Sequence, residues 1–306
     1  MPMWAALDDD DALVAHLRRT AHAVGLDAER VSAPSSQFVR VAGARFHYLD
    51  WESSGPPVLL LHGYGLTAHT WDAVVLGLHE SYRCLALDQR GHGQTDWGSA
   101  GDYVLEARAA AAAEMLDAVG VDEVAVVGQS LGGLVGLRLA ASLGRRIAAL
   151  AVVDASPFSP VTPGVGSRFR DRTFASPDEA FALVSRVSHG REPDVLRQNL
   201  LFNLRALPDG RWTWRYDQGA EMLRPEDFEA RNRALVALLA QVTLPALVVH
   251  GALSETITAE AAAELAEALP DGRMVTIADA GHNIQGDAPR ALADMLSGFF
   301  DDIGYR

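Results

Sequence analysis

The chain has 306 residues, of which 49% are hydrophobic, so it is long enough for one large α/β domain with an insertion or for two ordinary domains. Its formal net charge of −14 argues against the phosphate backbone of a nucleic acid or an anionic membrane surface as a partner. All 26 basic residues are arginine and Cys84 is the single cysteine, which excludes a Schiff-base lysine, a P-loop lysine, an intrachain disulfide and a thiolate zinc site.

The first part of the chain, residues 1–36, predicts a helical extension followed by a linker. Asp8 to Asp11 can cap a helix that carries Leu13 and Leu17 on one side, and residues 32–36 have the composition of a linker. The N-terminal residues lack the basic start and apolar middle of a secretory signal, and no segment is long and apolar enough to span a bilayer. We therefore expect a cytoplasmic protein without a membrane partner.

A sheet is predicted from residue 38 onward. Residues 38–41 and 45–51 predict a hairpin. Apolar strands then alternate with helices: strands at 58–62, 82–88, 124–128, 147–154, 244–250 and 273–278, helices at 70–78, 104–119, 134–143, 259–269 and 289–300. Uniformly apolar strands between helices are typical of a parallel sheet covered on both faces. The sequence therefore predicts an α/β fold with a mostly parallel, doubly wound sheet, built from residues 37–155 and 242–306.

The alternation breaks between residues 156 and 241. Seven prolines separate short helical stretches there, and no clear buried strand is visible. We predict that this segment is an insertion without a sheet of its own, forming a helical lid over the ends of the strands.

Aromatic side chains in this insertion are candidates for substrate binding. Trp212, Trp214 and Tyr216 would share one side of an extended segment, and Tyr64 and Trp71 are further candidates to line the same pocket. Packing of the lid onto the core is an equally good explanation of the lid aromatics.

The segment Gly128-Gln-Ser-Leu-Gly132 follows an apolar strand and precedes a helix. A serine between two glycines at a strand-to-helix turn is the nucleophile elbow pattern, in which small residues allow a strained turn. The alternative is a serine that caps the following helix. The flanking strand and helix favour Ser130 as a nucleophile.

A serine nucleophile needs a base and an acid that orients the base. Among the histidines that follow Ser130, we favour His282, in a glycine turn after the last predicted strand, over His189 and His250. Asp154 ends one predicted strand and Glu255 lies in the loop after the next, both at the carboxyl edge of the sheet, where ligands bind in open α/β folds. From the residues alone, either carboxylate remains a candidate for the acid.

Taken together, four motifs resemble the α/β-hydrolase superfamily over about residues 38 to 302. They are His62-Gly-Tyr-Gly65, Asp88-Gln-Arg-Gly-His-Gly-Gln-Thr95, the elbow, and Ala280-Gly-His282. The resemblance implies that the backbone N–H groups of Tyr64 and Leu131 form the oxyanion hole. For His62 and His92 we prefer a role in bracing loops by hydrogen bonds.

The resemblance also bears on the acid. The common family pattern places it three residues after a glycine, where this chain has Ser254 after Gly251. Glu255 comes one residue too late. Some family members carry the acid after the strand that follows the elbow helix, and Asp154 matches that location. We therefore prefer Asp154, and we expect Ser254 to add a hydrogen bond to His282.

A serine at the elbow implies acyl chemistry, whereas an aspartate there would indicate a haloalkane dehalogenase or an epoxide hydrolase. We predict a serine hydrolase for a small, largely apolar carboxylic ester or lactone that needs no metal or organic cofactor. The alternatives are a carbon–carbon hydrolase for a β-diketone-like ring-cleavage product, a non-catalytic receptor on the same fold, and, remotely, a nicotinamide oxidoreductase built on Gly63 to Ala68 with Asp88. The oligomeric state is not specified by the sequence.

Overall fold

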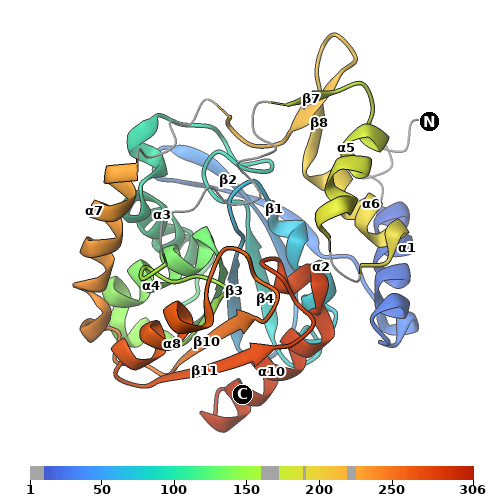
Figure 1. Ribbon diagram of the computed structural model, residues 1–306. Coiled ribbons are helices and arrows are strands. Elements are labelled where there is room, and N and C mark those ends of the chain that lie inside the picture. The colour runs from blue at the N-terminus through green and yellow to red at the C-terminus, as the bar shows by residue number, and fades with distance from the viewer. Residues whose placement is uncertain (1–9, 160–171, 189–190, 219–224) are drawn as a thin grey trace.

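A central sheet lies at the middle of the fold (Figure 1). The computed structural model describes residues 10–159, 172–188, 191–218 and 225–306. The eight strands of the sheet in this described part are β1 (Ser35–Val41), β2 (Ala44–Trp51), β3 (Pro57–Leu61), β4 (Arg83–Leu87), β5 (Val124–Gln129), β6 (Ile147–Val153), β10 (Ala246–Gly251) and β11 (Gly272–Ile277). Their order is β1-β2-β4-β3-β5-β6-β10-β11. β2 pairs antiparallel with both β1 and β4, and the remaining pairs are parallel. The predicted mostly parallel sheet is confirmed.

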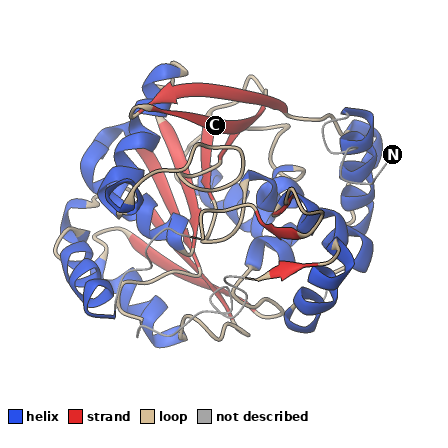
Figure 2. Ribbon diagram, turned by 90° about the horizontal axis from the view of Figure 1, so that it is seen from above, coloured by secondary structure: helices blue, strands red, loops and turns tan. Residues whose placement is uncertain are grey.

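Helices cover both faces of this sheet because alternate strand residues point to opposite sides. Leu59 and Leu61 pack into one apolar cluster, whereas Val58 and Leu60 pack into the other. The first cluster is covered by α3 (Leu105–Ala118), α4 (Leu131–Leu143), α7 (Pro225–Val236) and α8 (Ala259–Ala268). The second is covered by α2 (Asp72–Val75) and α10 (Pro289–Asp302). Figure 2 shows the strands between these layers.

The insertion differs from the prediction in having a small sheet of its own. Its strands β7 (Thr173–Phe174), β9 (Trp212–Trp214) and β8 (Leu204–Ala206) pair antiparallel in that order. Strands of two or three residues are too short to show the alternation by which a strand is recognised in sequence. Two helices, α5 (Pro177–Val184) and α6 (Pro193–Phe202), complete this part of the insertion. The predicted absence of a sheet is therefore wrong.

The N-terminal helix α1 (Asp10–Ala23) packs against both the insertion and the core. Leu13 and Leu17 of this helix belong to one buried cluster with Leu76 of the core and Phe202 of α6. Asp8 and Asp9 of the predicted cap lie outside the described residues. Within the described ranges, no helix is long and apolar enough to cross a membrane.

Candidate active site

Ser130 stands at a strained turn between β5 and α4. Its φ is 53° and its ψ is −117°, a backbone conformation that residues other than glycine rarely adopt. The flanking glycines are required by close approach, because a Cβ on Gly132 would overlap the carbonyl oxygen of Leu61 and one on Gly128 would overlap that of Gly132. The Ser130 side chain makes no capping hydrogen bond to α4, which argues against the helix-cap alternative.

The imidazole of His282 bridges Ser130 and Asp154. Its Nε2 lies 3.1 Å from Ser130 Oγ, and its Nδ1 lies 2.7 Å from Asp154 Oδ2. The loop that carries His282 follows β11. It is held to the end of β5 by the Gln129 side-chain amide, which donates to the His282 carbonyl oxygen at 2.9 Å. The ring is 22% exposed, so a substrate can reach it. The competing His189 lies outside the described residues.

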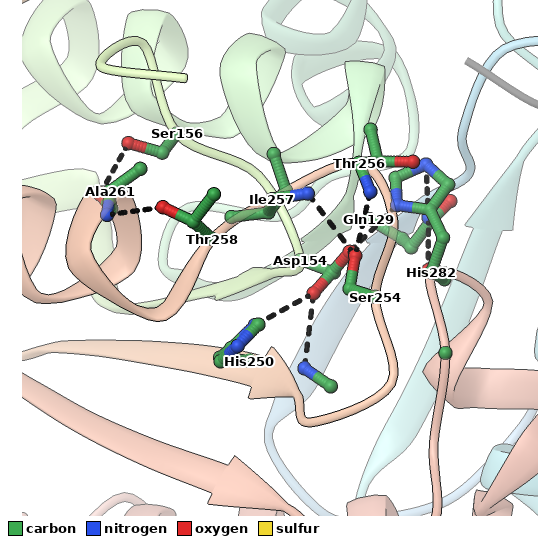
Figure 3. A network of polar contacts seen from close by, with 12 residues as sticks. Gln129, Asp154, Ser156, His250, Ser254, Thr256, Ile257, Thr258, Ala261 and His282 are labelled. Atoms are coloured by element: carbon green, nitrogen blue, oxygen red, sulfur yellow. Dashed lines mark hydrogen bonds and ion pairs between the residues drawn. The ribbon is translucent and has the colours of Figure 1, made fainter. Parts of the chain in front are cut away.

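Asp154 is fully buried and receives four hydrogen bonds (Figure 3). Its Oδ2 accepts from His282 Nδ1 and, at 2.6 Å, from Ser254 Oγ. Its Oδ1 accepts from the Gly251 N–H at 3.0 Å and from His250 Nδ1 at 3.3 Å. Because a carboxylate offers about four acceptor sites, these donors fix its orientation completely. The second histidine, His250, is thus a hydrogen-bonded support of the carboxylate.

Ser254 occupies a different place in the network from the one predicted. Its hydroxyl donates to Asp154 rather than to His282, and it accepts from the Thr256 and Ile257 N–H groups at 3.2 Å each. Glu255 is exposed to solvent. Of the two candidate acids, the structure therefore brings only Asp154 to His282.

The loop after β3 passes beside Ser130. A Cβ on Gly63 would overlap the Gln129 amide and lie 3.3 Å from Ser130 Cβ. His62 braces this loop, since its Nδ1 donates to the Gly63 carbonyl oxygen at 2.8 Å and its Nε2 accepts from the Gln89 N–H at 3.0 Å. Burial lowers the pKa of His62 to about 4, so the ring stays neutral and Nε2 stays an acceptor.

His92 braces the next part of this loop. Its Nε2 accepts from the Gly65 N–H at 3.1 Å and its Nδ1 donates to the Arg90 carbonyl oxygen at 3.1 Å. Burial and the neighbouring His62 ring hold the pKa of His92 well below its usual value. The bracing role that we preferred for both histidines agrees with these contacts.

Of the two backbone N–H groups expected to form an oxyanion hole, that of Leu131 directly follows Ser130 in the chain, and that of Tyr64 lies on the loop after β3. Leu131 is the first residue of α4, and N–H groups in the first turn of a helix have no partner within the helix. Tyr64 follows Gly63, which touches the elbow. This pairing of an elbow N–H with a loop N–H is suited to a developing oxyanion.

Asp88 is part of the scaffold. Its carboxylate accepts from the Ala68 N–H at 2.7 Å, the Gln94 N–H at 2.9 Å and His47 Nδ1 at 2.7 Å. Burial opposes its ionisation, but the hydrogen bond and charge of His47 lower the pKa of Asp88 to about 2. A carboxylate engaged by three donors of its own chain is poorly placed to bind a ribose, which argues against the nicotinamide interpretation.

The predicted aromatic residues divide among three places. Trp212 and Trp214 are buried within the insertion, where the Trp214 ring meets Phe174 edge-on at 5.2 Å. The Tyr216 ring lies against the Tyr64 ring, with 5.1 Å between their centroids, where the insertion meets the loop after β3.

Trp71 is enclosed in the core cluster beside α2 and α10. A polar cavity of about 220 Å³ lies between insertion and core; Trp212 lines it together with Phe202, Arg215, Thr67, His69 and Asp88.

Gln129 is the site residue that the sequence analysis did not single out. Its side chain is fully buried, and its Nε2 lies 3.4 Å from His282 Nε2 in addition to holding the His282 carbonyl. The elbow pattern leaves this position free, so the motif carries no signal for its role. No group of three or more His, Cys, Asp or Glu side chains in the described ranges is arranged to hold a metal ion.

Comparisons with known proteins show which family and fold the chain resembles. A family model described as the alpha/beta hydrolase fold matches residues 56–289. The esterase Rv0045c of Mycobacterium tuberculosis is 34% identical over 281 residues, which cover 89% of this chain and 91% of that protein. The crystal structure of this esterase superposes with a TM-score of 0.77 at 29% identity, covering 96% and 98% of the two chains. Haloalkane dehalogenase 2 of the same organism is 27% identical over 265 residues, covering 82% of this chain and 90% of that protein.

Proposed function

The chain belongs to the α/β-hydrolase family, and on that premise we propose that it hydrolyses carboxylic esters through an acyl-enzyme formed on Ser130. One observation carries the proposal: an unbroken hydrogen-bonded series from Ser130 Oγ through His282 to the buried carboxylate of Asp154, with distances of 3.1 and 2.7 Å. Nucleophile, base and orienting acid in this order are the parts that acyl transfer by serine requires. Similarity over most of the chain to a protein named an esterase supports the choice of ester substrates.

The geometry supports the following mechanism. His282 Nε2 takes the Ser130 proton as the hydroxyl oxygen attacks the ester carbonyl, and the N–H groups of Tyr64 and Leu131 stabilise the oxyanion. Asp154 accepts from Nδ1, which keeps the Nε2 lone pair directed at the serine and stabilises the imidazolium. His282 then protonates the leaving alcohol and activates the water that releases the acid. The steps require no metal or organic cofactor.

We further propose that the substrate is a small, largely apolar ester or a lactone. A lactone is a cyclic ester, so the same steps open its ring, and the leaving alcohol stays attached to the acyl group. The ring of Tyr64, on the loop after β3, lies against that of Tyr216 from the insertion, and the two would meet the part of the substrate next to the carbonyl. The small-molecule substrate is the only partner that this function needs.

Related chemistry of the same fold is distinguished by the elbow residue. Haloalkane dehalogenases use an aspartate there to form an alkyl ester, and this chain has Ser130 in that position. Dehalogenation is therefore not proposed, despite the similarity to haloalkane dehalogenase 2.

The decisive experiment combines labelling with turnover. A fluorophosphonate probe should label the wild-type protein and Ser142→Ala, which changes an exposed serine of α4, but not Ser130→Ala. A panel of esters and lactones of graded acyl and alcohol size should be hydrolysed by the first two proteins only. Ligand binding without labelling would support a receptor instead, and ester turnover by Ser130→Ala would reject Ser130 as the nucleophile.

A further inference from the structure

An ion pair joins the insertion to the loop that carries His282. Asp287 ends the short helix α9 (Ile284–Asp287), five residues after His282. Its Oδ1 accepts from Arg191 Nε at 2.8 Å, and its Oδ2 accepts from the Gly281 N–H at 3.0 Å. Arg191 precedes α6 and comes from the insertion. One carboxylate thus connects the insertion to the backbone immediately before His282.

The contact is shaped to receive a guanidinium group. A Cβ on Gly286 would lie 2.5 Å from Arg191 Cζ, so the guanidinium rests directly on the backbone of a residue that has no side chain. Arg191 Nη2 also approaches the Asn283 carbonyl oxygen at 3.5 Å. The side chains of Arg191 and Asp287 are 17% and 4% exposed, so water has little access to the pair. Buried charges of this kind persist when each is paired and hydrogen-bonded.

The loop around His282 is therefore held from two directions. The elbow holds it through the Gln129 amide, which donates to the His282 carbonyl oxygen. The insertion holds it through Arg191 and Asp287, which fix the Gly281 N–H. If Arg191 were removed, Asp287 would be a buried carboxylate without a counter-ion, and it would turn toward water or take up a proton. Either change weakens the hydrogen bond to Gly281 and lets the imidazole move.

We propose that Arg191 is a positioning residue for the reaction: through Asp287 and Gly281 it fixes the place of the His282 imidazole between Ser130 and Asp154. This inference rests on the proposed function, because it takes His282 as the base. It assigns a catalytic consequence to the insertion that is separate from substrate contact. Loss of the ion pair should lower kcat and leave KM nearly unchanged.

The first test compares two arginines of the insertion. Arg191→Ala should lower kcat about 10- to 100-fold, since a misplacement of about 1 Å in a catalytic group has an effect of that order. Arg197→Ala is the matched control, because Arg197 pairs with Asp178 inside the insertion and away from the histidine loop. Arg191→Lys should recover only part of the activity, because an ammonium group lacks the flat face that rests on Gly286.

A second variant keeps the test decisive if Arg191→Ala does not fold. Arg191→Met combined with Asp287→Asn removes both charges and leaves no buried carboxylate unpaired. It should fold and still show the loss of kcat, because a neutral amide holds the Gly281 N–H less firmly than a carboxylate does. Wild-type kcat in this double variant would overturn the proposal.

An independent readout separates this inference from the proposed function. The proton between His282 Nδ1 and Asp154 should give a low-field NMR signal that is shifted or broadened in Arg191→Ala and unchanged in Arg197→Ala. If Ser130→Ala still hydrolyses esters, the proposed function fails, and the NMR signal alone decides whether Arg191 positions His282. If Arg191→Ala matches Arg197→Ala in both kcat and signal, the inference about Arg191 is wrong.

Discussion

Substitution of Asp154, the proposed acid, gives the sharpest test of the proposed triad. Replacement of Asp154 by asparagine should lower kcat by about 10⁴-fold, the loss that this change produces in a serine protease triad, equivalent to about 5.5 kcal/mol of transition-state stabilisation. The structure supplies the reason. The asparagine oxygen would keep the hydrogen bonds from Gly251 and His250, so its amide NH₂ would face His282. His282 Nδ1 would then have to accept, and the ring proton would move to Nε2, which could no longer take the Ser130 proton.

The same geometry predicts a way to restore activity. Ser254 Oγ lies 2.6 Å from the Asp154 oxygen that contacts His282. An aspartate side chain is one bond longer than serine, so a carboxylate at position 254 reaches toward His282 Nδ1. It can also accept from the Thr256 and Ile257 N–H groups that now donate to the serine. Adding Ser254→Asp to Asp154→Asn should therefore raise kcat at least about 10-fold above that of Asp154→Asn alone, or about 1.4 kcal/mol of the loss.

The assay is hydrolysis of one reactive ester by four proteins, with active-site titration to correct for the folded fraction. They are the wild type, Asp154→Asn, and Asp154→Asn combined with either Ser254→Asp or Ser254→Asn. The last variant is the matched control, because it fills the same space without a charge. If the aspartate and asparagine combinations are equally slow, the proposed equivalence of the two positions is wrong.

Three further changes probe the elbow, the bracing histidines and the rejected acid. Gly132→Ala should lower the melting temperature and the titratable fraction of active sites, because the new Cβ overlaps the Leu61 carbonyl oxygen; an unchanged melting curve would contradict the close approach. Burial lowers the pKa of His62 from 6.5 to about 4, so the unfolded chain binds a proton in this window that the folded chain does not. The free energy of unfolding should consequently fall by up to about 3 kcal/mol as the pH drops from about 6.5 to 4, and urea titrations that show no pH dependence there would refute this. Glu255→Gln should change kcat/KM less than about twofold, since the side chain is exposed and charge changes at such sites have small effects, and a large loss in the ester assay would reopen the choice of acid.

Local patterns were sufficient to predict the sheet and the elbow. Buried parallel strands such as β3 and β5 are apolar throughout, and a pattern of this kind depends on neighbouring residues only. Ser130 was recognisable because the turn needs glycines at fixed offsets. The order of these features along the chain was therefore enough to predict most of the fold.

Contacts between distant segments were not predictable in the same way. Arg191 and Asp287 are 96 residues apart, and neither belongs to a motif. Whether Trp212 and Trp214 pack inside the insertion or contact a substrate depends on how the insertion folds. The sequence left these two possibilities equally open. The strands β7 and β8 are defined by their partner β9 and not by a pattern of their own.

The position of the acid becomes clear when distance is counted across the sheet instead of along the chain. β6 and β10 are parallel neighbours, with Val153 paired to Val249, and the next residue, Asp154, donates its N–H to the Val249 carbonyl oxygen at 2.7 Å. The ends of the two strands thus meet at one point beneath His282. A carboxylate that follows either strand can reach the ring there, and in this chain the residue after the other strand, Ser254, donates a hydrogen bond to that carboxylate. Glu255 does not reach this point, because the turn after β10, in which the Ser254 N–H donates to the Gly251 carbonyl oxygen at 2.9 Å, places Ser254 there and leaves Glu255 exposed.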